Sequence, residues 1–300
     1  MMECEKERSE HVLPPWADLL EEGEFISYLP SYEVGAYFHL FDKLVYHDDT
    51  LGDITYYIFD PIKHGAPKDR KYPICMWYHG ASNSLVGEVC ISYSGAEMFA
   101  SPEYQKRFGG AYIVVPLANE ERIEDGRLTG CWNDSYIKPM KGLFDEIIRQ
   151  HADTVSVNII FGNSCGSSFC WSMTKTYPEF LHGAVIVSGA NVPTDEELRN
   201  IDTNNVHIIV AHGKRDELTN FDQYILPHVK MFGQMKHCIC YFPEWVKNGD
   251  GGIASINYGV EMGQHCLINQ FQANLMYQDG TCYDERLPEG ITGWLNDILM

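Results

Sequence analysis

From about residue 53 onward, short apolar segments alternate with segments of helical periodicity. The apolar segments are rich in aromatic and β-branched residues, have the length of buried strands, and lie at 54–61, 72–80, 111–118, 155–162, 184–189, 205–213 and 237–244. Apolar residues at helical spacing occur in segments 139–151, 167–178, 268–277 and 290–299. This alternation predicts an α/β fold, with a mostly parallel sheet of about eight strands and helices on both faces.

The N-terminal part of the chain departs from this pattern. Segments 54–61 and 72–80 are separated by the turn-rich stretch KHGAPKDRK, which predicts a hairpin and therefore an antiparallel N-terminal edge of the sheet. We expect residues 1–50 to form an extension packed on the core of a single α/β domain that spans 51–300. The long glycine-rich loop 244–264 is a candidate for a substrate-covering insertion.

Composition narrows the classes of ligand. The formal net charge is −20 at pH 7, and the 22 Lys and Arg residues form no basic stripe, so phosphate backbones and anionic membranes would be repelled. We therefore expect no nucleic acid and no membrane as partner, and a neutral or cationic small molecule as substrate. Ten scattered cysteines, no signal-peptide pattern and no run of about 18 apolar residues favour the reducing cytoplasm. No sequence feature sets an oligomeric state.

A G-x-S-x-G motif at 162–166 is centred on Ser164 and joins the strand 155–162 to the helix that follows. A nucleophilic serine requires this context, because a sharp strand-to-helix turn exposes its hydroxyl. The turn gives the serine a positive φ and requires small neighbours, a requirement that Gly162 and Gly166 meet. The alternative is a serine that only caps the helix. We predict that Ser164 is a nucleophile.

A catalytic acid is expected after the next strands, because catalytic groups gather at the carboxyl ends of strands in an open α/β sheet. The strand 205–213 leads directly into Lys-Arg-Asp-Glu and places Asp216 at this edge. Glu217 is the adjacent rival, and Asp222 is a weaker one. We predict that Asp216 is the acid that orients the base.

Three histidines follow Asp216 and are candidates for the base. His237 opens a strand, at the wrong end for the site, and His228 lies in a helix-like stretch. His265 lies on a loop after the last strand and just before a helix, with Gly263 nearby to give the turn freedom. This is the expected position in the order serine, acid, histidine, so we predict that His265 is the base.

An oxyanion hole needs two backbone N–H groups near the nucleophile. One comes from Cys165, which follows Ser164 at the start of a helix, where N–H groups have no intrahelical partner. The other is expected from the loop after segment 72–80, where Gly80 and Ala81 are the candidates and Ala81 is favoured. The thiol of Cys165 is a rival nucleophile, but its side chain would point away from His265.

Together these motifs resemble those of the α/β-hydrolase superfamily. The residues that carry the resemblance are His-Gly at 79–80, Gly-Asn-Ser-Cys-Gly at 162–166, His-Gly-x-x-Asp at 212–216 and a late Gly-x-His ending at His265. Within the superfamily the chain is similar to the bacterial esterase group related to polyhydroxybutyrate depolymerases, feruloyl esterases and predicted peptidases. In that group a tryptophan segment, here CWND at 131–134, precedes the helix before the nucleophile. The resemblance covers roughly residues 50–300.

The resemblance implies a serine esterase that cleaves carboxylic esters through an acyl-enzyme on Ser164, without a metal or an organic cofactor. A small neutral or aromatic, feruloyl-like ester is the expected substrate. The candidates for contact with that substrate are His79, Asn163, Trp132 and Trp245. Two alternatives stay open: a serine peptidase of the prolyl-oligopeptidase-like type, and a catalytically silent binding protein with the hydrolase fold. A metal site at 237–240 is disfavoured, because its two cysteines lack a second pair of ligands.

Overall fold

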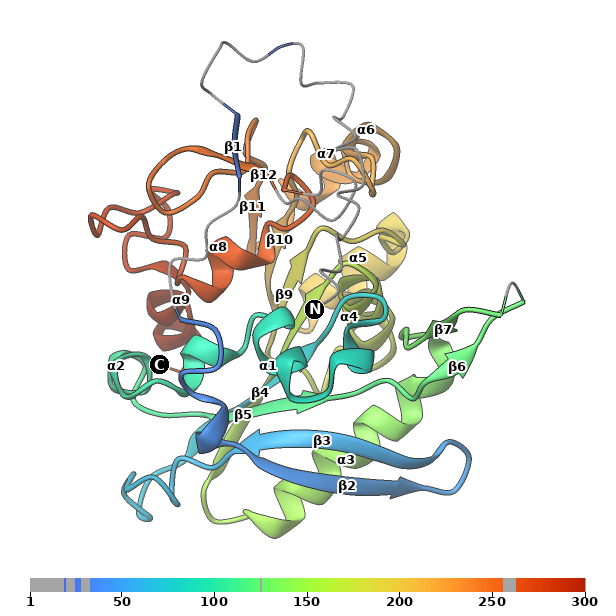
Figure 1. Ribbon diagram of the computed structural model, residues 1–300, viewed down its shortest axis with the longest axis vertical. Helices are drawn as coiled ribbons and strands as arrows, with labels where there is room; N and C mark the ends of the chain where they lie inside the picture. The colour runs from blue at the N-terminus through green and yellow to red at the C-terminus, as the bar shows by residue number, and fades with distance from the viewer. Residues whose placement is uncertain (1–18, 20–24, 28–32, 125, 256–262, 300) are drawn as a thin grey trace, which may run out of the picture.

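The computed structural model describes residues 19, 25–27, 33–124, 126–255 and 263–299. Its centre is an eight-stranded sheet in the order β11-β10-β9-β8-β4-β5-β3-β2 (Figure 1). These strands are β2 (Asp42–Asp48), β3 (Gly52–Phe59), β4 (Tyr72–Tyr78), β5 (Tyr112–Pro116), β8 (Val155–Asn163), β9 (Gly183–Val187), β10 (His207–Ala211) and β11 (Cys238–Tyr241). Every pairing from β11 to β5 is parallel, and β3 is antiparallel to both β5 and β2. The expected α/β architecture with an antiparallel N-terminal edge is confirmed.

Helices cover both faces of this sheet (Figure 1). The α-helices are α1 (Cys90–Tyr93), α2 (Pro102–Arg107), α3 (Ile137–Gln150), α4 (Cys165–Thr176), α5 (Asp195–Thr203), α6 (Phe221–Tyr224), α7 (Val229–Phe232), α8 (Ile268–Gln272) and α9 (Gly290–Leu299). Short 3-10 helices are η2 (Phe38–Leu40), η3 (Asn83–Val89), η4 (Glu97–Ala100), η5 (Asp134–Tyr136) and η6 (Leu226–His228). No helix in the described ranges is both long and apolar enough to cross a membrane.

Strand β4 explains how the two faces become two cores. Every one of its residues is buried, and alternate side chains point to opposite faces of a strand. Met76 and Tyr78 pack in one apolar cluster with α3, α4 and α5. Cys75 and Trp77 pack in the other with α1, α2, α8 and α9. A strand buried on both faces belongs at the centre of a sheet, with a neighbour on each side.

The prediction that segments 54–61 and 72–80 form a hairpin is wrong, because β4 has a parallel neighbour on each side and does not pair with β3. Strand β5 lies between β3 and β4 and pairs with both. The antiparallel partner of β3 is β2, whose residues run in register from Asp42 opposite Ile58 to Asp48 opposite Gly52. The sheet therefore begins inside the segment 1–50 that we expected to be an extension.

Two further differences concern the C-terminal third. Helix α8 ends at Gln272, earlier than expected, because Asn274 and Leu275 have φ values of 60° and 56° that a helix cannot include. Part of the loop 244–264 forms β12 (Ile253–Ser255), which pairs in parallel with β1 (Phe25–Ser27). Residues 256–262 of that loop lie outside the described residues, so its role as a substrate-covering insertion stays a prediction.

In the middle of the chain, a small antiparallel pair of strands was not expected. It consists of β6 (Glu121–Arg122) and β7 (Leu128–Thr129).

Candidate active site

Three loops that carry predicted site residues follow neighbouring strands at the carboxyl edge of the sheet (Figure 1). His79 follows β4, Ser164 follows β8, and Asp216 lies on the loop after β10. Strands β4 and β8 are adjacent, and only β9 separates β8 from β10. Ligands and substrates of open α/β sheets bind at this edge, so the topology brings the predicted residues to one region.

Ser164 occupies a sharp turn between β8 and α4. Its φ is 55° and its ψ is −118°, a conformation that costs a non-glycine residue of order 1–3 kcal/mol. The turn is held from both sides: the Ser164 N–H donates to the carbonyl of Val187 at 2.9 Å, and its own carbonyl accepts from Ser167 and Ser168 in the first turn of α4. The side chain is partly exposed. The expected positive φ is therefore present, on a serine that solvent can reach.

The glycines on either side of Ser164 permit close packing of this turn. A Cβ atom on Gly162 would lie 2.6 Å from the sulfur of Cys170. A Cβ atom on Gly166 would lie 2.6 Å from the carbonyl oxygen of His79 and even closer to that of Tyr78. Real Cβ atoms do not approach backbone this closely, so the two glycines allow α4 to begin directly against the end of β4.

Asp216 and His265 form a buried pair. The Nδ1 atom of His265 lies 2.9 Å from Oδ2 and 3.0 Å from Oδ1 of Asp216, and both residues are almost fully buried. Oδ1 of Asp216 also accepts the backbone N–H groups of Leu218 and Thr219. Burial raises the pKa of Asp216, but hydrogen bonds and the neighbouring histidines outweigh it and hold the pKa below its usual value. An ionised Asp216 fixes the proton of His265 on Nδ1 and leaves Nε2 as the basic atom.

Thr219 and His212 complete the surroundings of Asp216. His212 belongs to the His-Gly-x-x-Asp motif but had no predicted role, and Thr219 was not predicted. Thr219 Oγ1 donates to Asp216 Oδ2 at 2.8 Å and lies 3.2 Å from the carbonyl oxygen of Ser188. His212 Nε2 donates to the carbonyl of Thr219 at 2.7 Å and lies 3.4 Å from Asp216 Oδ2. Burial lowers the pKa of His212, against the opposing effects of Asp216 and of the bond to Thr219. The end of β9 thus connects the serine turn to the acid. The N–H of Ser164 is hydrogen-bonded to the carbonyl of Val187, and the hydroxyl of Thr219 contacts the carbonyl of Ser188, the residue after Val187.

Asp222 and the two rival histidines lie elsewhere. Asp222 is exposed at the start of α6, and His228 lies in η6. The ring of His237 stacks on that of His207 at 4.2 Å, at the amino ends of two adjacent strands. Only His265 of the three candidate histidines contacts Asp216 through an observed hydrogen bond.

The loop after β4 lies against the serine turn, as an oxyanion hole requires. A Cβ atom on Gly80 would be 3.6 Å from the Cβ of Ser164 and 3.4 Å from Nδ2 of Asn163. The backbone N–H groups of Ala81 and Cys165 have no hydrogen-bond acceptor in the described part of the chain. Ala81 is exposed, whereas Gly80 is buried. Ala81 and Cys165 therefore stay the predicted donors of the oxyanion hole.

His79 has a different place from the one expected of a residue that contacts substrate. Its ring is fully buried, Nε2 accepts the N–H of Ala118 at 3.0 Å, and Nδ1 donates to the carbonyl of Gly80 at 2.6 Å. Burial lowers the pKa of His79 to about 4, so the ring is neutral and one tautomer serves both bonds. His79 therefore positions the Gly80 loop, and its buried ring offers no surface to a substrate.

The two tryptophans expected to contact the substrate differ in exposure. Trp132 is 6% exposed and packs among Tyr78, Tyr136 and Phe169, so most of its ring belongs to the core. Trp245 is partly exposed, with the guanidinium of Arg215 lying 5.2 Å from its ring centre.

Asn163 precedes the serine and is buried, and its Oδ1 has no hydrogen-bond partner among the described residues. The Cys165 sulfur lies 3.7 Å from the carbonyl oxygen of His79. In the described ranges no group of three or more His, Cys, Asp or Glu side chains is arranged to hold a metal ion.

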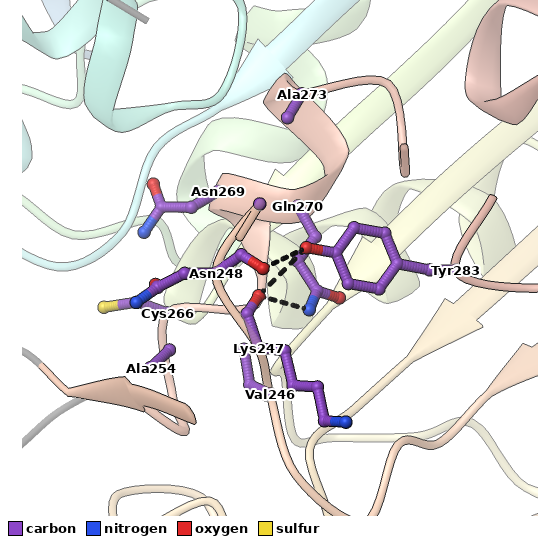
Figure 2. A pocket seen from close by; sticks show the side chains of 10 residues that line it. Val246, Lys247, Asn248, Ala254, Cys266, Asn269, Gln270, Ala273 and Tyr283 are labelled. Atoms are coloured by element: carbon purple, nitrogen blue, oxygen red, sulfur yellow. Dashed lines mark hydrogen bonds between the residues drawn. The ribbon is translucent and has the colours of Figure 1, made fainter. Parts of the chain in front are cut away.

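A small pocket lies beside Cys266, the residue that follows His265 (Figure 2). Its walls come from residues 246–249 and from α8, and Tyr283 lines it while donating to the carbonyl of Asn248 at 2.8 Å. The volume is about 20 Å³, room for about one water molecule. Both amide atoms of the buried Asn248 side chain have no partner among the described residues. The pocket does not include the Asp216–His265 pair and is too small for an acyl group.

Comparison with known proteins shows the fold. No protein-family model and none of the curated proteins matches the chain. A thermostable esterase has a TM-score of 0.58 and 18% identity, with 79% of this chain and 61% of that chain covered, so this chain spans less than two thirds of that esterase. A ferulic acid esterase has a TM-score of 0.53 and 13% identity, with 78% and 94% covered. A mutant feruloyl esterase module from Clostridium thermocellum, complexed with sinapinate, has a TM-score of 0.53 and 11% identity, with 83% and 92% covered.

The chain thus has the α/β-hydrolase fold, and the resemblance inferred from its motifs is confirmed at that level. The three solved structures just described are esterases.

Proposed function

We propose that the protein is a serine esterase with Ser164 as nucleophile, His265 as base and Asp216 as the acid that orients the base. The observation that carries the proposal is the buried Asp216–His265 pair, at the same edge of the sheet as a serine with a φ of 55°. A structural serine would not require this strained turn. The esterases among its structural neighbours support the reaction class.

The proposed reaction is a two-step acyl transfer. His265 Nε2 takes the hydroxyl proton as Ser164 Oγ attacks the ester carbonyl carbon, and Asp216 stabilises the imidazolium that forms. The N–H groups of Ala81 and Cys165 receive the oxyanion. The tetrahedral intermediate collapses to an acyl-enzyme as His265 protonates the departing alcohol. Water, deprotonated by His265, then releases the acid and regenerates the serine.

The sharpest test is labelling with a fluorophosphonate, which reacts with activated serines. We expect one adduct on the peptide that contains Ser164, and no adduct after Ser164→Ala or His265→Ala. Ser172→Ala is the matched control, because Ser172 lies two turns along α4 and donates to Asp134. A folded protein that is not labelled at Ser164, or that turns over an activated ester as fast after Ser164→Ala, contradicts the proposal.

For the substrate we propose a small neutral or aromatic ester, with a feruloyl-like acyl group as the specific case. Two neighbours with TM-scores of 0.53 are ferulic acid or feruloyl esterases, and the partly exposed Trp245 is an aromatic surface for a planar acid. Competition between p-nitrophenyl butyrate and methyl ferulate tests the point. A higher kcat/KM for the ferulate supports it, and no preference for the aromatic acid rejects it.

We propose a cytoplasmic location for the protein. Every cysteine in the described residues is a free thiol, and free thiols persist in reducing compartments. The net charge of −20 supports the absence of nucleic-acid and membrane partners. Fractionation of the native host, with detection by an antibody, tests the location.

A further inference from the structure

Ser82, which follows the predicted oxyanion donor Ala81, has a backbone conformation that serine rarely adopts. Its φ is 62° and its ψ is 4°, in the left-handed region. The φ of Ala81 is not positive, and the carbonyl of Gly80 accepts the N–H of Asn83 at 3.2 Å. Residues 80–83 therefore form a type II turn, with Ser82 at the position that favours glycine. This conformation is costly for a residue that has a Cβ atom.

Strained serines gather at the carboxyl edge of the sheet. Among the described residues, the serines with a positive φ are Ser82, Ser164 and Ser188, and the last two have a φ of 55°. They lie in the loops after β4, β8 and β9, which are neighbouring strands. Strained backbone persists only where the surrounding structure enforces it, and it clusters at active sites. The contacts of Ser82 should therefore show what enforces its conformation.

These contacts come from the end of the β6–β7 hairpin, which extends from the body of the domain (Figure 1). The N–H of Ser82 donates to the carbonyl of Gly130 at 2.8 Å. Its Oγ lies 3.2 Å from Oγ1 of Thr129, the last residue of β7. A Cβ atom on Gly130 would overlap the side chain of Ser84 and lie 3.1 Å from the carbonyl oxygen of Ala118. The glycine thus allows the hairpin to contact the Ser82 loop directly.

The beginning of the hairpin contacts the same loop from its other side. The N–H of Ala118 donates to Nε2 of His79, whose Nδ1 donates to the carbonyl of Gly80. The next residue, Asn119, is fixed to the domain, because its N–H donates to the hydroxyl of Tyr136 at 2.8 Å. The two ends of the hairpin therefore hold the residues immediately before and after Ala81.

We propose that the base of the β6–β7 hairpin holds the N–H of Ala81 in the orientation that receives the oxyanion, with Ser82 and Thr129 as positioning residues. This inference rests on the proposed function. The bond to Gly130 fixes the direction of the Ser82 N–H and hence the peptide plane between Ala81 and Ser82. In a type I turn that plane is turned over, so the N–H would point away from Gly130. The bond therefore stabilises the type II turn against its strain.

The experiment replaces Ser82 with residues that differ in their tolerance of a positive φ. Glycine adopts this φ freely and keeps the N–H, so Ser82→Gly should keep the kcat for p-nitrophenyl butyrate within about threefold of the wild type. Valine is β-branched and is excluded from this region. Ser82→Val should therefore shift the turn and lower kcat about 10- to 100-fold, with little change in KM. An unchanged kcat in Ser82→Val, or equal losses in both variants, overturns the proposal.

A thionoester separates the oxyanion hole from general damage to the site. Its carbonyl oxygen is replaced by sulfur, which is a weak hydrogen-bond acceptor. The measured quantity is kcat/KM for p-nitrophenyl butyrate divided by kcat/KM for the corresponding thionobutyrate. This ratio should be lower in Ser82→Val than in the wild type. A lower kcat with an unchanged ratio would mean that Ser82 does not act on the oxyanion hole, and it overturns the proposal.

Asn205→Val is the matched control for backbone strain. Asn205 also has a positive φ, 57°, but it lies in the turn before β10, at the opposite edge of the sheet. The control should lower the midpoint of urea unfolding, as Ser82→Val does, and leave both kcat and the ratio unchanged. A loss of kcat equal to that of Ser82→Val would mean that strain anywhere in the fold reduces turnover, which overturns the proposal.

The contribution of the hairpin side chain is tested at Thr129. Thr129→Val removes the hydroxyl contact but leaves the backbone bond of Gly130, so kcat should fall only about threefold. Thr129→Ser keeps a hydroxyl and should restore kcat. Equal turnover in Thr129→Val and the wild type overturns the role of Thr129.

Hydrogen exchange at the N–H of Ser82 tests the contact with the hairpin without relying on activity. We expect slow exchange in the wild type, because this N–H is bonded to Gly130, and faster exchange in Ser82→Val. A wild type without turnover contradicts the proposed function and the catalytic effect inferred from it. Slow exchange would then still support the hold of the hairpin on Ser82, and fast exchange would overturn it, which separates the two failures.

Discussion

The hydroxyl of Thr219 donates to Oδ2 of Asp216 at 2.8 Å and lies 3.3 Å from Nδ1 of His265. Thr219 thus contacts both partners of the acid–base pair and, through Ser188, the end of β9 that also holds the serine turn. The contacts of its hydroxyl are with Asp216, His265 and Ser188, so we regard Thr219 as a positioning residue. Its loss should affect turnover more than substrate binding.

We predict that Thr219→Val lowers kcat about tenfold, with little change in KM, because a hydrogen bond to a charged group contributes about 1.5–3 kcal/mol and part of it is regained by relaxation. Removal of a donor to the ionised carboxylate should also raise the pKa of Asp216. The activity of the variant should therefore begin to fall at a higher pH than that of the wild type as the solution is acidified. Steady-state kinetics between pH 4 and 8 measures both effects. Thr219→Ser, which keeps the hydroxyl, should restore both, and equal losses in the two variants would argue for a packing role only.

We predict that Asp216→Asn lowers kcat about 10³- to 10⁴-fold while the protein stays folded. The amide has the size of the carboxylate, but it cannot hold the proton of His265 on Nδ1 or stabilise an imidazolium. Stopped assays with an activated ester measure the loss. Asp222→Asn is the control, because Asp222 is exposed and is the weaker of the two rival acids in the sequence. If Asp222→Asn caused the larger loss, the assignment of Asp216 would be wrong.

The site residues that the sequence predicted are mostly those whose signal lies in one short stretch of the chain. The turn at Ser164 was predictable because a buried strand, two glycines and a helix lie within one continuous stretch. Asp216 was predicted after a strand and His265 on a later loop before a helix, and the structure brings the two side chains together although they are 49 residues apart. Thr219 had a local signal that was missed: it lies three residues after Asp216, and its N–H caps the carboxylate at 2.8 Å.

The errors arise where partners are distant in the chain. The predicted pairing of β3 with β4 failed because β5, more than 30 residues later, pairs with both strands. His79 was named as a candidate for contact with the substrate. Its ring is instead buried, and its Nε2 accepts a hydrogen bond from the N–H of Ala118, 39 residues away. Neither contact leaves a pattern in the nearby sequence, and both depend on how the sheet is assembled.

We predict that Gly166→Ala destabilises the protein by about 3 kcal/mol or more, because its Cβ would overlap backbone atoms of Tyr78 and His79, which cannot rotate away. The free energy of unfolding in urea measures the loss. Gly233→Ala is the matched control: Gly233 has a φ of −67°, and the nearest atoms to its Cβ would be at 3.6 Å and 3.7 Å. The control should change stability by less than about 1 kcal/mol. Equal effects in the two variants would show that close packing at the serine turn is not required.

The last prediction concerns acid stability and His79. Burial holds the pKa of His79 at about 4 in the folded protein, against about 6.5 in an unfolded chain. The unfolded state therefore binds a proton more readily over this interval. The contribution of His79 is fully present above pH 6.5 and is lost as the pH falls toward 4. A shift of this size corresponds to about 3 kcal/mol.

Urea unfolding of the wild type and of His79→Gln at pH 7, 5.5 and 4.5 tests this contribution. The glutamine variant should be less stable at pH 7, because its amide cannot reproduce both ring bonds, but it should lose less stability on acidification than the wild type. The gap between the two proteins should narrow by about 2 kcal/mol over this range. His39→Gln is the control, since His39 lies in η2 and makes neither of these bonds. A gap that stays constant with pH would mean that the His79 ring is not held neutral by burial.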